Sequence, residues 1–218
     1  MKFGAIFDWD GVIVDSSKYH KQSWEVLAEE ENQIVPAGFF KLAFGMKNEN
    51  IIPEILKWQV KPGDINRLSL RKEELYRTLM AEQGLQPLRG VTRFLTMLKR
   101  NGIPCAIGTS THRSNVTGAL EEFNMANNFE GMIGSEDVTE GKPDPQVFLK
   151  AAELLNIDPR NCIAFEDVPV GIEAARNAGM KAIAVTTTHV PSKLTEADLV
   201  VDQLDQLSLQ RLQELFGA

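Results

Sequence analysis

The chain has 218 residues, of which 43% are apolar and 24% are charged, and its formal net charge is -7. This length and composition suit one large domain, or one domain that carries a smaller inserted domain. The acidic balance and the lack of a Lys/Arg-rich run argue against nucleic acid or an anionic membrane as partner, because both bind clustered positive charge.

The cysteines and the N-terminal residues bear on the compartment. Cys105 and Cys162 each lie in an apolar segment typical of a buried strand, so neither a disulfide framework nor a Cys-based zinc site is expected. Asp8 and Asp10 interrupt the apolar run that a signal peptide would need, and no stretch approaches ~18 apolar residues. We expect a cytoplasmic protein, either a monomer or a weak homodimer.

The first predicted strand covers residues 3–7 and ends at Asp8. The stretch that follows, from about residue 17 to 83, contains no convincing strand and resembles a run of helices. These helices are expected at 18–31, 49–58 and 62–81. We predict an inserted all-helical cap domain. Its expected bounds are 16–84, and those of the catalytic core are 1–15 with 85–218.

After the cap, the chain alternates between amphipathic helices and short apolar strands that end in polar residues. The helices are expected at 91–100, 114–123, 145–155 and 170–178. The strands are expected at 103–108, 132–133, 162–165 and 182–185. This alternation predicts an α/β fold with a doubly wound, Rossmann-like parallel sheet, in which ligands bind at the carboxyl ends of the strands. The polar strand ends are therefore expected to converge on one site.

Two carboxylates follow the first strand directly, in Asp8-Trp9-Asp10-Gly11-Val12. Side chains two positions apart on an extended backbone point to the same side. Like charges so close raise one pKa unless a cation neutralises them, which suits a pair in which one carboxylate attacks while the other holds a proton. On this motif alone, a simple turn at Gly11 stays an alternative.

The later strand ends add groups that can bind a phosphate. Thr109 offers a hydroxyl for a phosphoryl oxygen, and Ser110 and Thr111 add donors near a helix start, although Thr111 is equally suited to cap that helix. Lys142 lies in Gly-Lys-Pro-Asp-Pro, a stiff segment that can direct an ammonium group at a phosphate.

Glu166 and Asp167 close a strand that is otherwise apolar, at a place where a hard cation would need oxygen ligands. Helix capping by Asp167 is the competing role. Together the strand ends supply a nucleophile, a proton carrier, a phosphate-binding hydroxyl, a neutralising Lys and metal-binding carboxylates. This set predicts phosphoryl transfer.

In this order the motifs resemble those of the haloacid dehalogenase superfamily, in the helical-cap branch that includes β-phosphoglucomutase and sugar-phosphate phosphatases. The segment 7–16 is similar to the first motif of the family, Thr109 to the second, Lys142 to the third, and Glu166 with Asp167 to the fourth. The resemblance covers essentially the whole chain.

The resemblance implies an aspartyl-phosphate mechanism that depends on Mg²⁺. By this analogy Asp8 attacks phosphorus, and Asp10 protonates the leaving oxygen and then deprotonates the attacking water. Asp8, the backbone carbonyl of Asp10, Glu166 and Asp167 would hold Mg²⁺. Thr109 and Lys142 would hold the phosphoryl oxygens.

The cap is expected to set specificity because it closes over the site. His20, Trp24 and Lys72 match positions that face the substrate in β-phosphoglucomutase, and Lys47 is a further candidate beside Gly45. Trp24 can instead belong to the cap core, and Lys47 and Lys72 can be solvated surface charges.

The cap also bears on the type of reaction. A mutase must hold a second phosphate, and β-phosphoglucomutase does so with an arginine a few residues after the glycine that matches Gly45. This chain lacks that arginine, and Lys47 cannot reproduce a bidentate guanidinium. We therefore expect hydrolysis of a small phosphorylated metabolite, preferably a sugar phosphate.

Three other functions are alternatives to this prediction. The first is a sugar-phosphate mutase, and the second is a phosphohydrolase of pyrophosphate or nucleotides. The third is a non-enzymatic binding module, which is disfavoured because Asp8, Asp10, Lys142 and Asp167 are all present.

Overall fold

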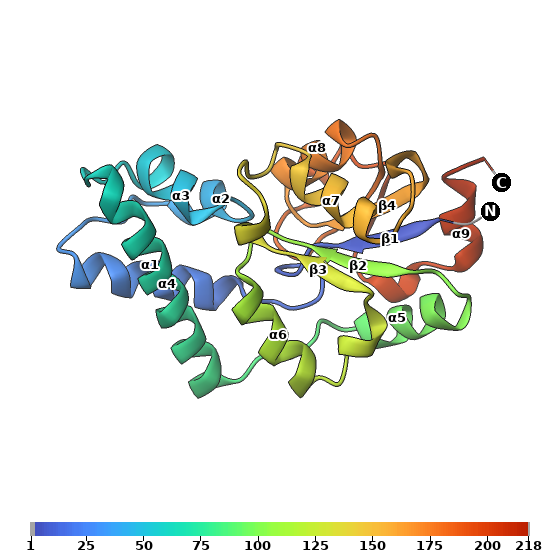
Figure 1. Ribbon diagram of the computed structural model, residues 1–218, viewed down its shortest axis with the longest axis horizontal. Helices are drawn as coiled ribbons and strands as arrows, with labels where there is room; N and C mark the ends of the chain where they lie inside the picture. The colour runs from blue at the N-terminus through green and yellow to red at the C-terminus, as the bar shows by residue number, and fades with distance from the viewer. Residues whose placement is uncertain (1–2, 218) are drawn as a thin grey trace.

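The core of the computed structural model, which describes residues 3–217, is a six-stranded parallel sheet (Figure 1). The strand order is β3-β2-β1-β4-β5-β6, so the chain builds the sheet outward in both directions from β1. The strands are β1 (Gly4–Phe7), β2 (Cys105–Gly108), β3 (Gly131–Ile133), β4 (Cys162–Glu166), β5 (Lys181–Val185) and β6 (Leu199–Val201). In such a sheet the ligand site lies where the order reverses, which here is the carboxyl end of β1.

Helices cover both faces of the sheet because alternate strand side chains point to opposite faces. One face, which includes Phe7 and Phe165, packs on α5 (Val91–Arg100), α6 (Arg113–Glu122) and α9 (Leu209–Glu214). The other face, rich in alanine, packs on α7 (Gln146–Leu154) and α8 (Pro169–Asn177). Figure 1 shows α7 and α8 on the opposite side of the sheet from α5 and α6.

The rings of Phe7 and Phe165 stack at the centre of the sheet, with centroids 4.5 Å apart. Both side chains are fully buried, and each burial contributes about 1.5–3 kcal/mol of hydrophobic stabilisation. Phe7 and Phe165 are paired in register, and each immediately precedes an acidic residue. The core thus fixes the positions of Asp8 and Glu166.

The inserted region forms a separate helical layer beside the sheet (Figure 1). Its own apolar core includes Trp24, Leu27 and Trp58. Pro62 lies in the first turn of the longest helix, where the N–H that proline lacks has no intrahelical partner. The elements are α1 (Ser17–Glu30), α2 (Phe39–Ala43), α3 (Asn48–Asn50), a π-helical turn (Ile51–Leu56) and α4 (Pro62–Gln83).

Two neighbouring segments connect the cap to the core. Val14 forms an antiparallel bridge with Pro87, and Leu88 N donates to Ile13 O at 2.8 Å. The Tyr19 hydroxyl donates to the Gly84 carbonyl at the same place. Both segments that connect the cap to the core therefore lie next to the carboxyl end of β1. The domain bounds 16–84 and 85–218 stay predictions.

The predicted parallel sheet with a helical insertion is confirmed, and most helix ends agree to within two residues. The sequence analysis missed α2, β6 and α9, which are only five, three and six residues long. The helix predicted at 49–58 is instead one short α-helix followed by a π-helical turn. Pro53 explains this difference, because it has no N–H for the regular helical ladder.

The two cysteines are free and buried in strands β2 and β4, as predicted. Among residues 3–217, no helix combines the length and the apolar character needed to cross a membrane.

Candidate active site

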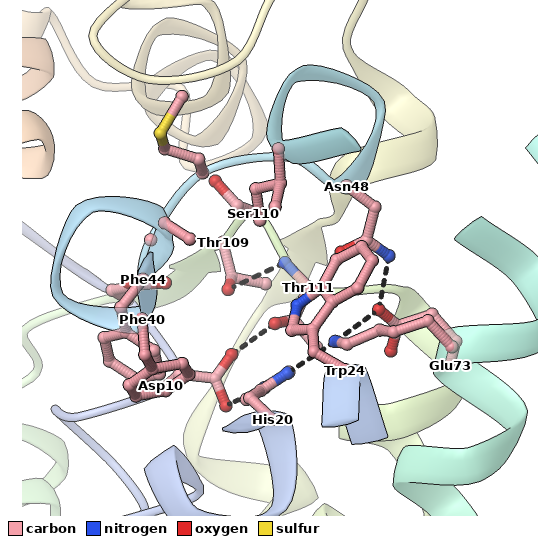
Figure 2. Close-up of a pocket in the computed structure, with 16 residues that line it drawn as sticks. Asp10, His20, Trp24, Phe40, Phe44, Asn48, Glu73, Thr109, Ser110 and Thr111 are labelled. Atoms are coloured by element: carbon pink, nitrogen blue, oxygen red, sulfur yellow. Dashed lines mark hydrogen bonds and ion pairs between the residues drawn. The ribbon is translucent and has the colours of Figure 1, made fainter. Parts of the chain in front are cut away.

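A pocket lies between the carboxyl ends of the strands and the cap (Figure 2). The core contributes Asp8, Asp10 and the hydroxyl residues at 109–111. The cap contributes aromatic and polar side chains. These are His20, Trp24, Phe40, Phe44, Asn48, Lys72 and Glu73, with apolar contacts from residues 43, 46 and 51.

Lys142 is buried among acids and is not solvated. Its Nζ lies 3.1 Å from Asp8 Oδ2 and 2.5 Å from Glu166 Oε1, and it sits 5.0 Å from the centre of the Phe148 ring. Burial lowers the pKa of Lys142, but Asp8 and Glu166 outweigh it and hold this pKa above its usual value. The ammonium therefore stays charged and fixes the Asp8 carboxylate.

Asp8, Glu166 and Asp167 form a buried acidic group whose carboxylate oxygens lie within 4.8 Å of one another. Burial raises the pKa of Asp8, Lys142 opposes this, and the neighbouring acids add to it, so that the pKa reaches about 7. Burial and Glu166 likewise hold the pKa of Asp167 well above its ordinary value. Within residues 3–217, Asp167 Oδ1 is buried without a hydrogen-bond partner. This excess of buried oxygen ligands fits a hard divalent cation.

Two glycines make room for this acidic group. A Cβ at Gly11, whose φ is +77°, would collide with the Asp167 carboxylate, and a Cβ at Gly171 would collide with that of Glu166. Glu166 Oε2 also accepts from the amides of Asp167 and Val168, at 2.9 and 3.3 Å. Gly11 is therefore required for close approach as well as for the turn that the sequence predicts.

Thr188 holds Asp167 and was not singled out from the sequence. Its Oγ1 donates to Asp167 Oδ2 at 2.5 Å and lies 2.9 Å from His189 Nδ1. The same hydroxyl lies 3.1 Å from the Asp167 carbonyl oxygen, whereas Asp167 Oδ1 has no partner within residues 3–217. Oδ1 is thus the oxygen of Asp167 that remains for a ligand.

Asp10 is turned away from the acidic group and toward the cap. It accepts from the hydroxyls of Ser16 and Thr111, and its Oδ1 lies 3.2 Å from His20 Nε2 (Figure 2). Burial raises the pKa of Asp10, but His20 and the two hydroxyls outweigh it and hold this pKa below its usual value. The carboxylate is therefore ionised near neutral pH and able to accept a proton.

His20 connects Asp10 to a buried ion pair in the cap. Lys72 Nζ lies 2.6 Å from His20 Nδ1 and 2.8 Å from Glu73 Oε1. Because a Lys ammonium has only donors, Nδ1 accepts and the ring proton is on Nε2, facing Asp10. His20 also stacks on Tyr76, with ring centroids 4.2 Å apart.

Asn48 and Asn115 complete this network, and neither was picked out from the sequence. Asn48 lies in the cap and donates to Glu73 Oε1 at 2.6 Å, whereas Asn115 lies in α6 of the core and donates to Glu73 Oε2. The Glu73 carboxylate therefore joins cap and core. Only the docking of α4 against α6 brings these residues together.

Known proteins are similar to this chain in sequence and in fold. A family model described as haloacid dehalogenase-like hydrolase matches residues 5–185. The chain belongs to the haloacid dehalogenase-like hydrolases. This family membership confirms the resemblance drawn from the motifs and with it the predicted enzyme class, a phosphatase of the haloacid dehalogenase type.

Two curated relatives span nearly all of the chain. It is 39% identical to the chloroplastic 5-amino-6-(5-phospho-D-ribitylamino)uracil phosphatase of Arabidopsis thaliana, over 97% of the chain and 57% of that protein. The chain thus spans little more than half the length of this relative. It is 32% identical to the β-phosphoglucomutase of Bacillus subtilis, over 96% of the chain and 93% of that protein.

Among solved structures, the fold is similar to that of the β-phosphoglucomutase of Clostridium difficile. The TM-score is 0.88 at 28% identity, and the match covers 100% of this chain and 98% of that one. This chain and that structure therefore share one overall architecture.

The structure brings most of the predicted site residues together, and their roles stay predictions. Thr109, Ser110 and Thr111 line the pocket, and Thr111 contacts Asp10 instead of capping α6, which begins after His112. Trp24 belongs to both the pocket and the cap core.

The predicted binding residue Lys47 is not among the residues that line the pocket. Its Nζ donates to the Val138 carbonyl at 2.9 Å and links cap to core.

The Glu73 network predicts a pH-dependent contribution to stability. Burial raises the pKa of Glu73, but Lys72, His20 and Asn48 outweigh it, so the pKa falls from 4.5 to about 2. The unfolded chain takes up this proton near pH 4.5, so the stabilisation is present above that pH and lost as pH falls toward 2. Glu73→Gln should therefore lower the free energy of unfolding by up to about 3 kcal/mol at pH 6.

Urea denaturation across this pH range tests the prediction. The difference between wild type and Glu73→Gln should narrow as pH falls below about 4.5, and Glu74→Gln, at an exposed neighbour, should show little difference at any pH. If Glu73→Gln lowers the free energy of unfolding by the same amount at every pH, the prediction is contradicted.

Thr188→Val should lower the free energy of unfolding by about 1–3 kcal/mol, because it leaves a buried carboxylate oxygen without its donor. Thr188→Ser keeps the hydroxyl and should stay close to wild type. Urea denaturation in EDTA at neutral pH measures both. Equal stability of the Val and Ser variants would show that the hydroxyl does not hold Asp167.

Proposed function

We propose that this chain is a Mg²⁺-dependent phosphatase that hydrolyses a sugar or sugar-alcohol phosphate through an aspartyl-phosphate on Asp8. The observation that carries the proposal is the position of Asp8. It lies against Lys142 and next to Glu166 and Asp167, in a pocket that Asp10 also lines. Nucleophile, neutralising cation, metal ligands and proton carrier are thus within one site.

Mg²⁺ would be held by Asp8, Asp167, Glu166 and the Asp10 backbone carbonyl, and it would neutralise charge on the phosphoryl oxygens and lower the pKa of Asp8. Lys142 contributes a second positive charge beside Asp8. Thr109, at the end of β2, would donate its hydroxyl to a phosphoryl oxygen. Positioning and charge neutralisation therefore supply most of the acceleration.

In the first step a carboxylate oxygen of Asp8 bonds to phosphorus as the bond to the leaving oxygen breaks. Asp10 gives that oxygen a proton. The contacts with His20, Ser16 and Thr111 hold the pKa of Asp10 low. A phosphate dianion beside Asp10 raises this pKa toward the value that a general acid needs. In the second step Asp10 takes a proton from water, whose oxygen attacks phosphorus and releases Asp8 and inorganic phosphate.

Hydrolysis is favoured over isomerisation by the charges of the cap. Lys72, a cation that lines the pocket, is already paired with Glu73, and His20 Nε2 lies beside Asp10. The chain has Asn48 and Lys47 but no arginine in this part of the cap. The relative at 39% identity is a phosphatase whose name gives a phosphoribitylamino uracil as its substrate. This compound is the phosphate of a sugar alcohol, which supports the proposed substrate class.

Phosphate release tests the proposal on sugar phosphates, sugar-alcohol phosphates, 5-amino-6-(5-phospho-D-ribitylamino)uracil, nucleotides and pyrophosphate. Asp8→Asn should reduce release by at least about 10⁴-fold, because the amide is no nucleophile, and EDTA should abolish it. Asp158→Asn, at an exposed site remote from the pocket, should act as wild type. Near-normal turnover by Asp8→Asn would overturn the mechanism.

The same assay separates the alternatives. Conversion of β-glucose 1-phosphate to glucose 6-phosphate with a trace of bisphosphate, without free phosphate, would favour the mutase. Release from nucleotides or pyrophosphate alone would favour the other phosphohydrolase. No reaction with any compound would favour a binding module.

A further inference from the structure

Asn48 is a polar residue of the cap that lines the pocket. Its amide has a fixed orientation, and its carbonyl oxygen is left as an acceptor. Asn48 Nδ2 donates to Glu73 Oε1 at 2.6 Å and to Ser69 Oγ at 3.2 Å. An ionised carboxylate only accepts, so the amide cannot be turned the other way. Asn48 Oδ1 therefore points away from Glu73, and within residues 3–217 it receives no hydrogen bond from the protein. Asn48 lines the pocket and is 9% exposed.

The partners of Asn48 are themselves held in place. Figure 2 shows the contact between Asn48 and Glu73. Glu73 also accepts from Lys72 and Asn115, and it is 3% exposed. These contacts come from α4, α3 and α6, so cap and core together fix the carboxylate. Because three side chains hold the Glu73 carboxylate, it is preorganised. Asn48, which donates to this carboxylate, therefore offers its carbonyl oxygen as an acceptor at low entropic cost.

The charges around Asn48 disfavour a second anionic group. Lys72 is paired with Glu73 at 2.8 Å, and His20 Nε2 lies 3.2 Å from Asp10, so neither the Lys72 ammonium nor the His20 N–H is free of a carboxylate. A second phosphate there would face an ionised Glu73 and the carbonyl of Asn48. Neutral hydroxyl or N–H groups would instead donate to this carbonyl.

The rest of the cap side of the pocket is apolar. Trp24, Phe40 and Phe44 line it together with Met46 and Ile51. Aromatic and aliphatic faces bury the carbon skeleton of a ligand, and a few fixed polar groups set its orientation. Asn48 is the fixed acceptor among these apolar side chains.

We propose that Asn48 Oδ1 accepts a hydrogen bond from the leaving group, and that the substrate is a monophosphate whose alcohol part carries neutral hydroxyl or N–H donors. This inference rests on the proposed phosphatase function and assigns part of its specificity. Asn48 is a specificity-determining residue and takes no part in the transfer of the phosphoryl group.

A matched pair of esters separates this role from a structural one. Ribitol 5-phosphate and pentyl phosphate have five carbons and one phosphate, but only the first has donors on its chain. For Asn48→Ala, kcat/KM should fall about tenfold more for ribitol 5-phosphate than for pentyl phosphate, since one hydrogen bond is lost with the first ester alone. Asn50→Ala is the control, because Asn50 is a half-buried amide on the same segment that contacts Glu54 and does not line the pocket.

The outcomes are distinct. If Asn48→Ala lowers kcat/KM for both esters by the same factor, or for neither, Asn48 only supports the cap and the inference is wrong, while the phosphatase function stands. If wild type releases phosphate from neither ester nor from any other monophosphate, the proposed function fails and the inference fails with it.

Should Asn48→Ala prove unstable, Asn48→Leu fills the same space without the acceptor. It should show the same loss of discrimination between the two esters. A Leu variant that discriminates as wild type does would overturn the proposal.

Discussion

The concentration of negative charge at the carboxyl ends of β1 and β4 is the constraint on which the site depends. Asp8, Glu166 and Asp167 are all buried, and within residues 3–217 Lys142 is the only Lys or Arg that contacts them. Like charges repel strongly away from water, so this arrangement persists only with compensating groups. Gly11 and Gly171 make room for these carboxylates, the Thr188 hydroxyl contacts Asp167, and Lys142 neutralises part of the charge. The acidic group that results fits a divalent cation.

A second chain of contacts couples this core to the cap. It runs from Asp10 through His20 and Lys72 to Glu73, and from Glu73 back to Asn115 in the core. The donors that lower the pKa of Asp10 therefore depend partly on where the cap lies. The proposed acceptor Asn48 and the donors to Asp10 are linked through the same few residues. In the proposed mechanism, this coupling would restrict proton transfer to a pocket in which the cap is in place.

The sequence allowed the catalytic part of the site to be predicted because its signals are local. An acid or hydroxyl that ends an apolar run, as at Asp8, Thr109 and Glu166, marks a buried strand that opens on a ligand site. The parallel topology then requires these ends to meet. The sheet followed from the alternation of strands and helices, and the cap followed from the stretch without strands that interrupts it.

The missed residues depend on tertiary packing. Three consecutive threonines follow β5, and only the register of β5 beside β4 directs Thr188 to Asp167. Asn48 gains its role from the packing of α3 on α4, and Asn115 from the docking of α4 on α6. Lys47 illustrates the converse, because an apparent anion-binding lysine contacts a backbone carbonyl instead. Short elements such as β6 carry too few residues for a periodic signal.

The central claim is that Asp8 receives a phosphoryl group with the help of Mg²⁺. Beryllium trifluoride mimics a phosphoryl group on an aspartate, and ¹⁹F NMR of the full chain detects its binding directly. The account predicts bound fluorine signals with Mg²⁺ in wild type, and their loss in EDTA and in Asp8→Asn. Identical bound signals in Asp8→Asn, or none in wild type with Mg²⁺, would contradict it.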